Sequence, residues 1–177
     1  KIYNTLTHKK ETFQPMEAGK VRMYVCGITT YDYLHIGHAR MLVAFDVILR
    51  YLRASDYEVR YVRNITDVDD KIIRRAQENN EPFDELAGRF INCMHEDEQA
   101  LNIIAPDIEP RATQHIEEII AMIRSLVDKE YAYQAENGDV YYAVAKFNNY
   151  ASLSRKNPDE LLAGARIEVG ESKLDPR

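Results

Sequence analysis

Hydrophobic and polar residues follow two different periods in the first part of the chain. Residues 21–27 (VRMYVCG) are mostly β-branched or aromatic and end at a glycine, which predicts a strand. Residues 57–66 (YEVRYVRNIT) alternate in the same manner and predict a second strand. Between them, residues 37–53 carry apolar side chains three to four positions apart, the period of a helix: Leu42, Phe45, Ile48, Leu49 and Leu52. The order strand, helix, strand indicates a βαβ unit with parallel strands.

The pattern changes in the second part of the chain. Residues 82–103 and 109–131 each place apolar residues on one face of a helix, and Pro82 suits a first helical turn. Residues 131–144 predict a β-hairpin, because Asn137-Gly138 is the preferred pair for a two-residue type I′ turn.

A composition shift marks a domain boundary near residues 105–110 (APDIEP). Farther on, residues 157–164 (NPDELLAG) predict a short helix that ends at glycine. The last residues, GARIEVGESKLDPR, are polar and supply no element that closes a fold. We therefore expect an α/β fold with a parallel sheet, followed by a part of different character, in a chain that is a piece of something longer.

Composition narrows the class of protein. Of the 177 residues, 45% are hydrophobic and 29% are charged, as in an ordinary globular protein. No apolar run is long enough for a membrane span, and the N-terminus has no apolar signal segment. Cys26 and Cys93 lie in unrelated contexts, which fits a reducing, cytoplasmic environment. The net charge of −6 argues against an extended nucleic-acid surface on these residues.

The most informative short motif is His35-Ile36-Gly37-His38, which opens the first predicted helix directly after a strand. Ligands of open α/β sheets bind at the carboxyl ends of strands, and a helix N-terminus favours phosphate. Gly37 would allow a phosphate or a base to approach the backbone. Three interpretations stay open on the pattern alone: phosphate binding, structural packing and a metal site, the last disfavoured because HxxH aims its nitrogens less well than HxxxH.

Several other polar residues have plain structural interpretations. Thr66 before Asp69 and Asp70 predicts a helix cap, although carboxylates so close together are also typical of magnesium sites. Cys93 occupies an apolar helix position and is expected in the core. His95 and His115 stand among acidic residues and are expected on the solvated surface.

Taken together, these segments resemble a known family. The HIGH sequence at 35–38 is similar to the signature of class I aminoacyl-tRNA synthetases. YVCGITTYDYLHIGHAR (24–40) and YVRNITDVDDKIIRRA (61–76) resemble cysteinyl-tRNA synthetases in particular, and so do PDIEPRATQHIEEII, GDVYYAV and GARIEV farther on. The resemblance implies a Rossmann-like nucleotide-binding half over residues 1–108 and the start of a connective insertion over residues 109–177. It also implies that the second catalytic half and the anticodon-binding domain lie outside this chain.

The resemblance assigns roles to individual residues. His35 and His38 would lie against the ATP phosphates and stabilise the transition state of adenylation. Cys26 would be one ligand of a zinc ion that holds the thiolate of substrate cysteine, with the other ligands outside this chain. The residues that would bind ATP and the adenylate are Gly27, Ile28, Thr29, His35, Gly37, His38, Asn64, Ile65 and Thr66.

A zinc ion makes physical sense in such an enzyme. Serine and cysteine are nearly isosteric, and a shaped pocket discriminates poorly between near-isosteres. A thiophilic metal prefers thiolate to hydroxyl and could select cysteine in one step.

The expected partners follow from the same family. They are cysteine, ATP with magnesium, and tRNA, with no membrane and with a monomeric enzyme that needs more than this chain for activity. Two rivals stay open: a related ligase that joins activated cysteine to an amino-sugar, and a non-catalytic paralogue that binds zinc or a protein partner.

Overall fold

The structure is a computed structural model that describes residues 1–155. The chain divides into two compact units: residues 14–116, and residues 1–13 together with the residues from Glu117 onward. The helix expected at 157–164 and the GARIEV segment lie outside the described residues. The expected boundary at residue 108 remains a prediction.

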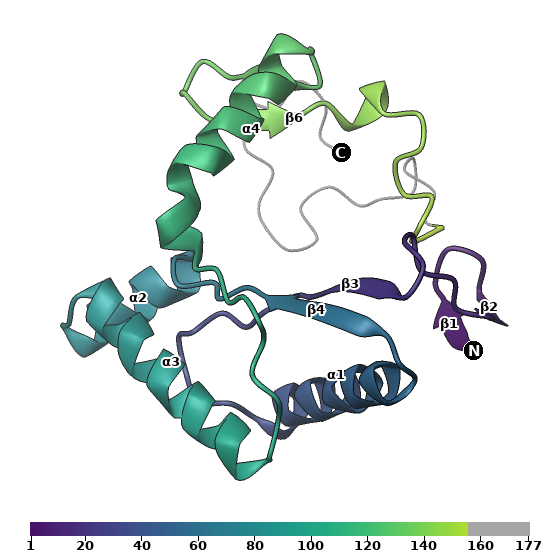
Figure 1. The fold of residues 1–177 in the computed structure, drawn as a ribbon. Coiled ribbons are helices and arrows are strands. Elements are labelled where there is room, and N and C mark those ends of the chain that lie inside the picture. The colour runs from purple at the N-terminus through teal and green to yellow at the C-terminus, as the bar shows by residue number, and fades with distance from the viewer. Residues whose placement is uncertain (156–177) are drawn as a thin grey trace. The chain divides into compact units, whose positions relative to one another are not determined.

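The unit of residues 14–116 is built on a parallel strand pair. Strand β3 (Lys20–Val25) pairs with β4 (Glu58–Arg63), in a register that runs from Lys20 beside Glu58 to Val25 beside Arg63. Helix α1 (Ile36–Ala54) connects the two strands, and Figure 1 shows it along one side of the pair. The βαβ unit predicted from the hydrophobic periods is thus confirmed.

Burial explains why α1 lies on the strands. Leu42 and Leu49 of its apolar stripe are buried, at 2% and 0% exposure. Leu42 belongs to a core cluster with Ile28, which follows β3, and Ile65, which follows β4. The cluster is completed by Ile91 and Met94 of the helix Phe83–Ala100. Each such side chain contributes about 1.5–3 kcal/mol when fully buried.

Helices α2 (Asp70–Asn79) and α3 (Phe83–Ala100) pack against each other. Their shared core consists of Ile72, Ala76, Leu86, Ala87 and Phe90. Asn80 ends α2 in the left-handed conformation, with φ 55°.

Three expectations for these helices are wrong. The N-cap of α2 is Asp69, whose carboxylate accepts from the Lys71 N–H at 2.9 Å, because Thr66 is still paired beside Thr29. Pro82 is the N-cap of α3 rather than a residue of its first turn. Cys93 is half-buried and lies outside the core clusters, since the buried stripe of α3 runs through Ile91 and Met94.

After α3 the chain returns along the free side of β4. Val62 forms a bridge with Ile108, and Ile65 forms one with Arg111, both parallel. The Asp107 carboxylate accepts from the Tyr61 N–H at 2.6 Å. The short 3₁₀ helix η1 (Ala112–His115) follows. This return segment gives β4 hydrogen-bonded neighbours on both sides.

The other unit contains two hairpins and a helix. Strands β1 (Ile2–Asn4) and β2 (Lys9–Glu11) form one hairpin. Helix α4 (Ile116–Asp128), which starts at the boundary, precedes the second hairpin, β5 (Ala132–Gln134) with β6 (Val140–Tyr142), and the 3₁₀ helix η2 (Val144–Lys146).

The β5–β6 hairpin is confirmed, but its turn is not type I′. A type I′ turn needs positive φ at both central residues. Here Gly138 has φ +91°, whereas Asn137 is not among the residues with positive φ. Ala135 donates its N–H to Asp139 O at 2.8 Å, so the loop holds three residues and Gly138 supplies its left-handed position.

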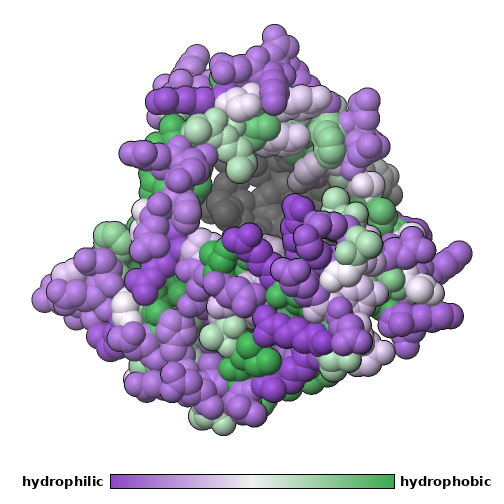
Figure 2. Space-filling view, in the orientation of Figure 1, coloured by the Kyte–Doolittle hydropathy of each residue, from purple (hydrophilic) through white to green (hydrophobic). Residues whose placement is uncertain are grey.

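Helix α4 buries none of its residues among those described. Its apolar stripe is 36–45% exposed: Ile116, Ile119, Ile120, Ile123 and Val127. Figure 2 shows hydrophobic surface among the polar side chains of this helix. No helix in the described part of the chain is both long and apolar enough to cross a membrane.

Candidate functional site

The two histidines of the HIGH motif form the cap of helix α1. His35 is the N-cap, with φ −114° and ψ 170°. Its Nδ1 accepts from the Gly37 N–H at 3.0 Å, and Nδ1 of His38 accepts from the His35 N–H at 3.3 Å. The rings are stacked, with centroids 3.8 Å apart and planes 19° from parallel. The imidazoles thus form a reciprocal capping box, in the places usually taken by Ser or Thr and Glu.

The capping hydrogen bonds determine the tautomer of both imidazole rings. A nitrogen that accepts a hydrogen bond from a backbone N–H cannot itself carry a proton, so each neutral imidazole is protonated on Nε2. Burial lowers the pKa of His38, and the neighbouring His35 lowers it further. In its neutral form each ring therefore offers an Nε2–H group that can donate to an anion, beside the positive end of the α1 dipole.

Gly37 is required by the cap itself. A Cβ at this position would lie 2.8 Å from Cε1 and 2.9 Å from Nδ1 of His35. The glycine expected to let a ligand approach also makes room for the ring that folds back over the helix start.

The second part of the site is the carboxyl end of the strand pair. Thr66 donates its N–H to Ile28 O at 3.2 Å, and Thr30 donates its N–H to Thr66 O at 3.2 Å. The carboxamide oxygen of Asn64 accepts from the Gly27 N–H at 2.7 Å. The structure thus brings the predicted segments 26–29 and 64–66 together at one sheet edge, where open α/β sheets bind ligands.

The histidine cap and the strand ends belong to one packed unit. Leu34, directly before His35, and Met41 of α1 pack against the cluster that contains Ile28 and Ile65. The side chains predicted to bind phosphate are therefore anchored to the same core as the segments predicted to bind the adenylate.

Cys26 fits the role of a single metal ligand. Its thiol is free and the residue is exposed, directly after β3. A zinc site takes three or four protein ligands. Among the described residues, the one set of three ligand-type groups close enough to share an ion is His95, Glu98 and Glu109, which does not include Cys26. The remaining ligands of a zinc ion on Cys26 would come from outside the described residues.

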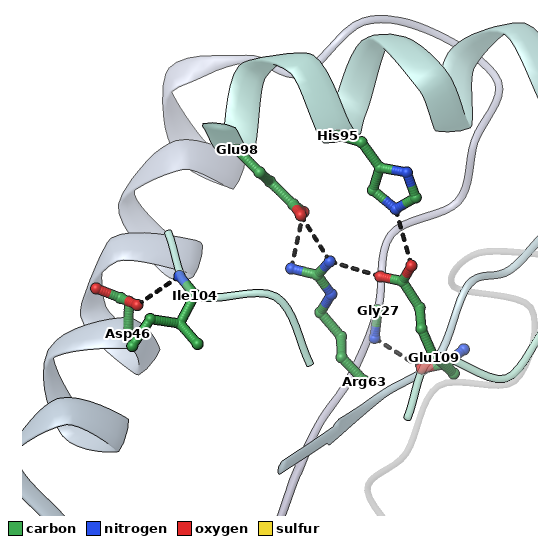
Figure 3. Close-up of polar contacts among 8 residues, drawn as sticks. Gly27, Asp46, Arg63, His95, Glu98, Ile104 and Glu109 are labelled. Atoms are coloured by element: carbon green, nitrogen blue, oxygen red, sulfur yellow. Dashed lines mark hydrogen bonds and ion pairs between the residues drawn. The ribbon is translucent and has the colours of Figure 1, made fainter. Parts of the chain in front are cut away.

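A buried ion-pair network lies under the strand end (Figure 3). Arg63, at 1% exposure, meets Glu98 through two nitrogen–oxygen pairs at 2.8 and 2.9 Å. Its Nη2 also lies 2.6 Å from Oε1 of Glu109. Oε2 of Glu109 in turn lies 2.8 Å from Nε2 of His95. This network joins β4, α3 and the return segment.

Arg63 competes with any cation for the carboxylates of the group His95, Glu98 and Glu109. Burial by itself disfavours the charged guanidinium, yet hydrogen bonds to Glu98 and Glu109 and the charge of Glu98 hold the pKa of Arg63 above its usual value. The guanidinium occupies the oxygens that a cation would need, so we interpret the cluster as a structural ion pair and not as a metal site.

The network was not predicted from the sequence. His95, expected on the solvated surface, keeps 38% of its side chain exposed but also contacts Glu109, whereas His115 is exposed as expected. The signal that could have found it is the spacing of His95 and Glu98, three positions apart on one helix face, together with a charged residue at an inward position of a predicted strand.

Comparisons with known proteins show which family the chain is similar to. The family described as tRNA synthetases class I (C) catalytic domain matches residues 12–177. Proteins named cysteine–tRNA ligase from Pseudomonas syringae and Azotobacter vinelandii are each 63% identical to the chain, and one from Chromohalobacter salexigens is 61% identical. Each match covers 99% of this chain and 38% of the relative, so the chain spans well under half the length of these proteins.

A solved structure supports the fold. Mycobacterium tuberculosis methionyl-tRNA synthetase in complex with methionyl-adenylate superimposes with a TM-score of 0.57 at 24% identity, over 69% of this chain and 26% of the other. With the family match over residues 12–177, the chain belongs to the class I (C) tRNA synthetase catalytic domain family.

Proposed function

We propose that the protein to which this chain belongs joins cysteine to ATP and passes the cysteinyl group to tRNA. The observation that carries this proposal is the 61–63% identity to cysteine–tRNA ligases over 99% of the chain. It is supported by the intact histidine cap at the start of α1. Neither rival, the amino-sugar ligase or the non-catalytic paralogue, has support of this kind.

The proposed first step needs positioning and charge stabilisation more than a general base. A carboxylate oxygen of cysteine attacks the α-phosphorus of ATP, the bond to the bridging oxygen breaks, and pyrophosphate leaves with that electron pair. Negative charge on the phosphate oxygens shifts during this exchange. The Nε2–H groups of His35 and His38 are suited to donate to those oxygens, and their fixed tautomer lowers the cost of reorganisation.

Two kinds of metal ion take part in the proposed reaction. Magnesium accompanies ATP as part of the substrate. Cys26 would hold zinc together with residues outside the described range, and the ion would supply selective binding of the substrate thiolate. We expect one zinc ion per full-length chain, and Cys26→Ser should lose it in metal analysis. Full zinc content in that variant would remove Cys26 from the ligand set.

We further propose that the enzyme is a cytoplasmic monomer, and that the 177 residues alone are inactive because they hold only part of the site. The segments that would line the cysteine and adenylate pocket are residues 27–29 and 64–66, at the ends of the two strands.

The direct experiment is ATP–pyrophosphate exchange by the full-length protein. We expect exchange with cysteine, at least about a hundredfold less with serine, and transfer to tRNA. Exchange with cysteine followed by transfer to an amino-sugar and not to tRNA would favour the rival ligase. No cysteine-dependent exchange by a folded protein would refute the proposal.

A further inference from the structure

The connection after β3 contains one residue more than the strand beside it requires. Val25 pairs with Arg63, and the next bridge joins Thr29 to Thr66. Four steps along the first segment therefore face three steps along the second. The pairing is interrupted here, and we call the extra residue a bulge by analogy with β-bulges, which redirect side chains next to functional sites.

Asn64 fills the gap that the bulge opens. Its Oδ1 accepts from the Gly27 N–H at 2.7 Å and from the Tyr24 hydroxyl at 2.8 Å. Its Nδ2 donates to Oγ1 of Thr66 at 3.3 Å. A side chain thus satisfies the Gly27 N–H, which the interrupted strand pairing leaves without a ladder partner.

The backbone of the bulge touches Asn64 as well. A Cβ on Gly27 would lie 1.5 Å from the carbonyl oxygen of Asn64, which no side chain could tolerate. Cys26, on the other side of this contact, is exposed. At Gly27 the chain therefore passes too close to Asn64 for a Cβ to fit, while the neighbouring cysteine is exposed.

Asn64 is itself held firmly. The Arg63 N–H donates to Ile108 O at 3.1 Å, and the Ile65 N–H donates to Pro110 O at 2.8 Å. The Arg63 guanidinium anchors the preceding residue in the buried network. Because the main chain on both sides is fixed, the carboxamide is oriented in advance of any ligand.

We propose that Asn64 is a positioning residue that locks the Cys26–Gly27 bulge and thereby sets the geometry of the cysteine subsite. Both lone pairs of its Oδ1 are used inside the protein, so this oxygen acts on the substrate through the residues that it holds in place. This inference rests on the proposed function for what occupies the subsite, but the lock itself is a property of the fold.

The test compares three variants of the full-length protein. Asn64→Ala removes the lock, Asn64→Asp keeps an acceptor oxygen for Gly27 and Tyr24, and Asn92→Ala changes an exposed asparagine on α3 as a control. We expect Asn64→Ala to raise KM for cysteine about tenfold. KM for ATP should rise by clearly less, because residues 27–29 also line the proposed adenylate pocket but the histidine cap is untouched. Asn64→Asp should recover most of the cysteine affinity.

Hydrogen exchange supplies a readout that does not depend on activity. We expect amide exchange in residues 26–30 to accelerate in Asn64→Ala and to stay near wild type in Asn64→Asp and Asn92→Ala. Unchanged exchange in Asn64→Ala would overturn the proposal, and so would equal increases in KM for cysteine and ATP. If Asn64→Ala does not fold, faster amide exchange in residues 26–30 of Asn64→Asp would contradict the proposal, because this variant keeps the acceptor oxygen. A wild-type protein without cysteine-dependent ATP–pyrophosphate exchange would refute the proposed function. The hydrogen-exchange comparison would still test whether Asn64 holds the bulge in place.

Discussion

The end of the β3–β4 pair and helix α4 have equally clear hydrophobic patterns, but the structure uses them differently. At the strand end, apolar stripes meet buried partners, and even a charged side chain, Arg63, is at 1% exposure. On α4 the apolar stripe is regular, yet all of its residues are at least 36% exposed within the described chain. A helical period shows which face is apolar and does not show what covers it.

The comparison also concerns rigidity. The strand end combines a bulge locked by Asn64, a capping box made of histidines and a buried ion pair, each of which fixes side chains without a ligand. Preorganised groups of this kind are what an adenylation site needs, because charge stabilisation is effective only when donors are already aimed.

The largest contrast should come from removing one buried charge. Arg63→Met would leave Glu98 buried without its partner and should lower the free energy of unfolding by about 3–5 kcal/mol. Arg124→Met, on the exposed surface of α4, should change it by less than about 0.5 kcal/mol. Denaturant unfolding of the full-length protein measures both.

A double variant sharpens this result. Arg63→Met with Glu98→Leu removes both members of the buried pair and should recover much of the lost stability, because Glu109 keeps His95 as a partner. A double variant as unstable as the single one would show that the ion pair is not the cause.

The next contrast concerns apolar side chains. Leu86→Ala, at 0% exposure in the α2–α3 core, should cost about 2–5 kcal/mol by cavity formation. Ile120→Ala on α4, at 42% exposure, should cost less than about 1 kcal/mol. An equal loss in both would show that the α4 stripe is covered in the full-length protein.

Two glycines provide a smaller contrast of opposite sign. Gly27→Ala forces a Cβ into the Asn64 carbonyl and should destabilise by about 1–3 kcal/mol. Gly88→Ala lies inside α3, with nothing within 4 Å of the new methyl, and should stabilise by about 0.5–1 kcal/mol. Thermal unfolding in parallel tests the pair, and a tolerated Gly27→Ala would contradict the close contact at the bulge.

The smallest expected effect is on pH dependence. Because the folded pKa of His38 lies below its unfolded value of about 6.5, the folded state favours the neutral ring. The resulting stability is present above about pH 6.5 and is lost as pH falls through the folded pKa. His38→Asn keeps an acceptor for the His35 N–H but does not titrate, so its stability should fall less than that of wild type over this range. Parallel pH profiles would contradict the lowered pKa.

How much of this could be predicted from the sequence differs by element. The βαβ unit was predictable because the helical period of Leu42 and Leu49 and the alternation in the two strands are local patterns that identify each element. The resemblance assigned His35, His38 and Asn64 to one site, and that assignment stays a prediction. The Arg63 network was not predicted, because Glu98 reaches Arg63 from α3 and Glu109 reaches it from the return segment beside β4, so neither contact is local in the sequence.

Errors in the local predictions have local causes. Thr66 was expected as a cap, but strand pairing with Thr29 extends that far, and Asp69 takes the cap instead. The Asn137-Gly138 pair suggested a two-residue turn, yet the bond between Ala135 and Asp139 closes a three-residue loop. In both cases a hydrogen bond made by a neighbouring segment decides between alternatives that sequence preferences leave close in energy.

The central claim is that the histidine cap of α1 presents Nε2–H donors to the phosphates during cysteine activation. Cysteine-dependent ATP–pyrophosphate exchange in two matched variants of the full-length protein tests it most directly. His38→Asn keeps the capping acceptor and loses the donor, whereas His38→Gln places an N–H near the position of Nε2. We expect His38→Asn to fold normally and to lower the exchange rate about a hundredfold or more, and His38→Gln to lose less. Near-normal exchange by His38→Asn would show that the histidine serves only as a cap.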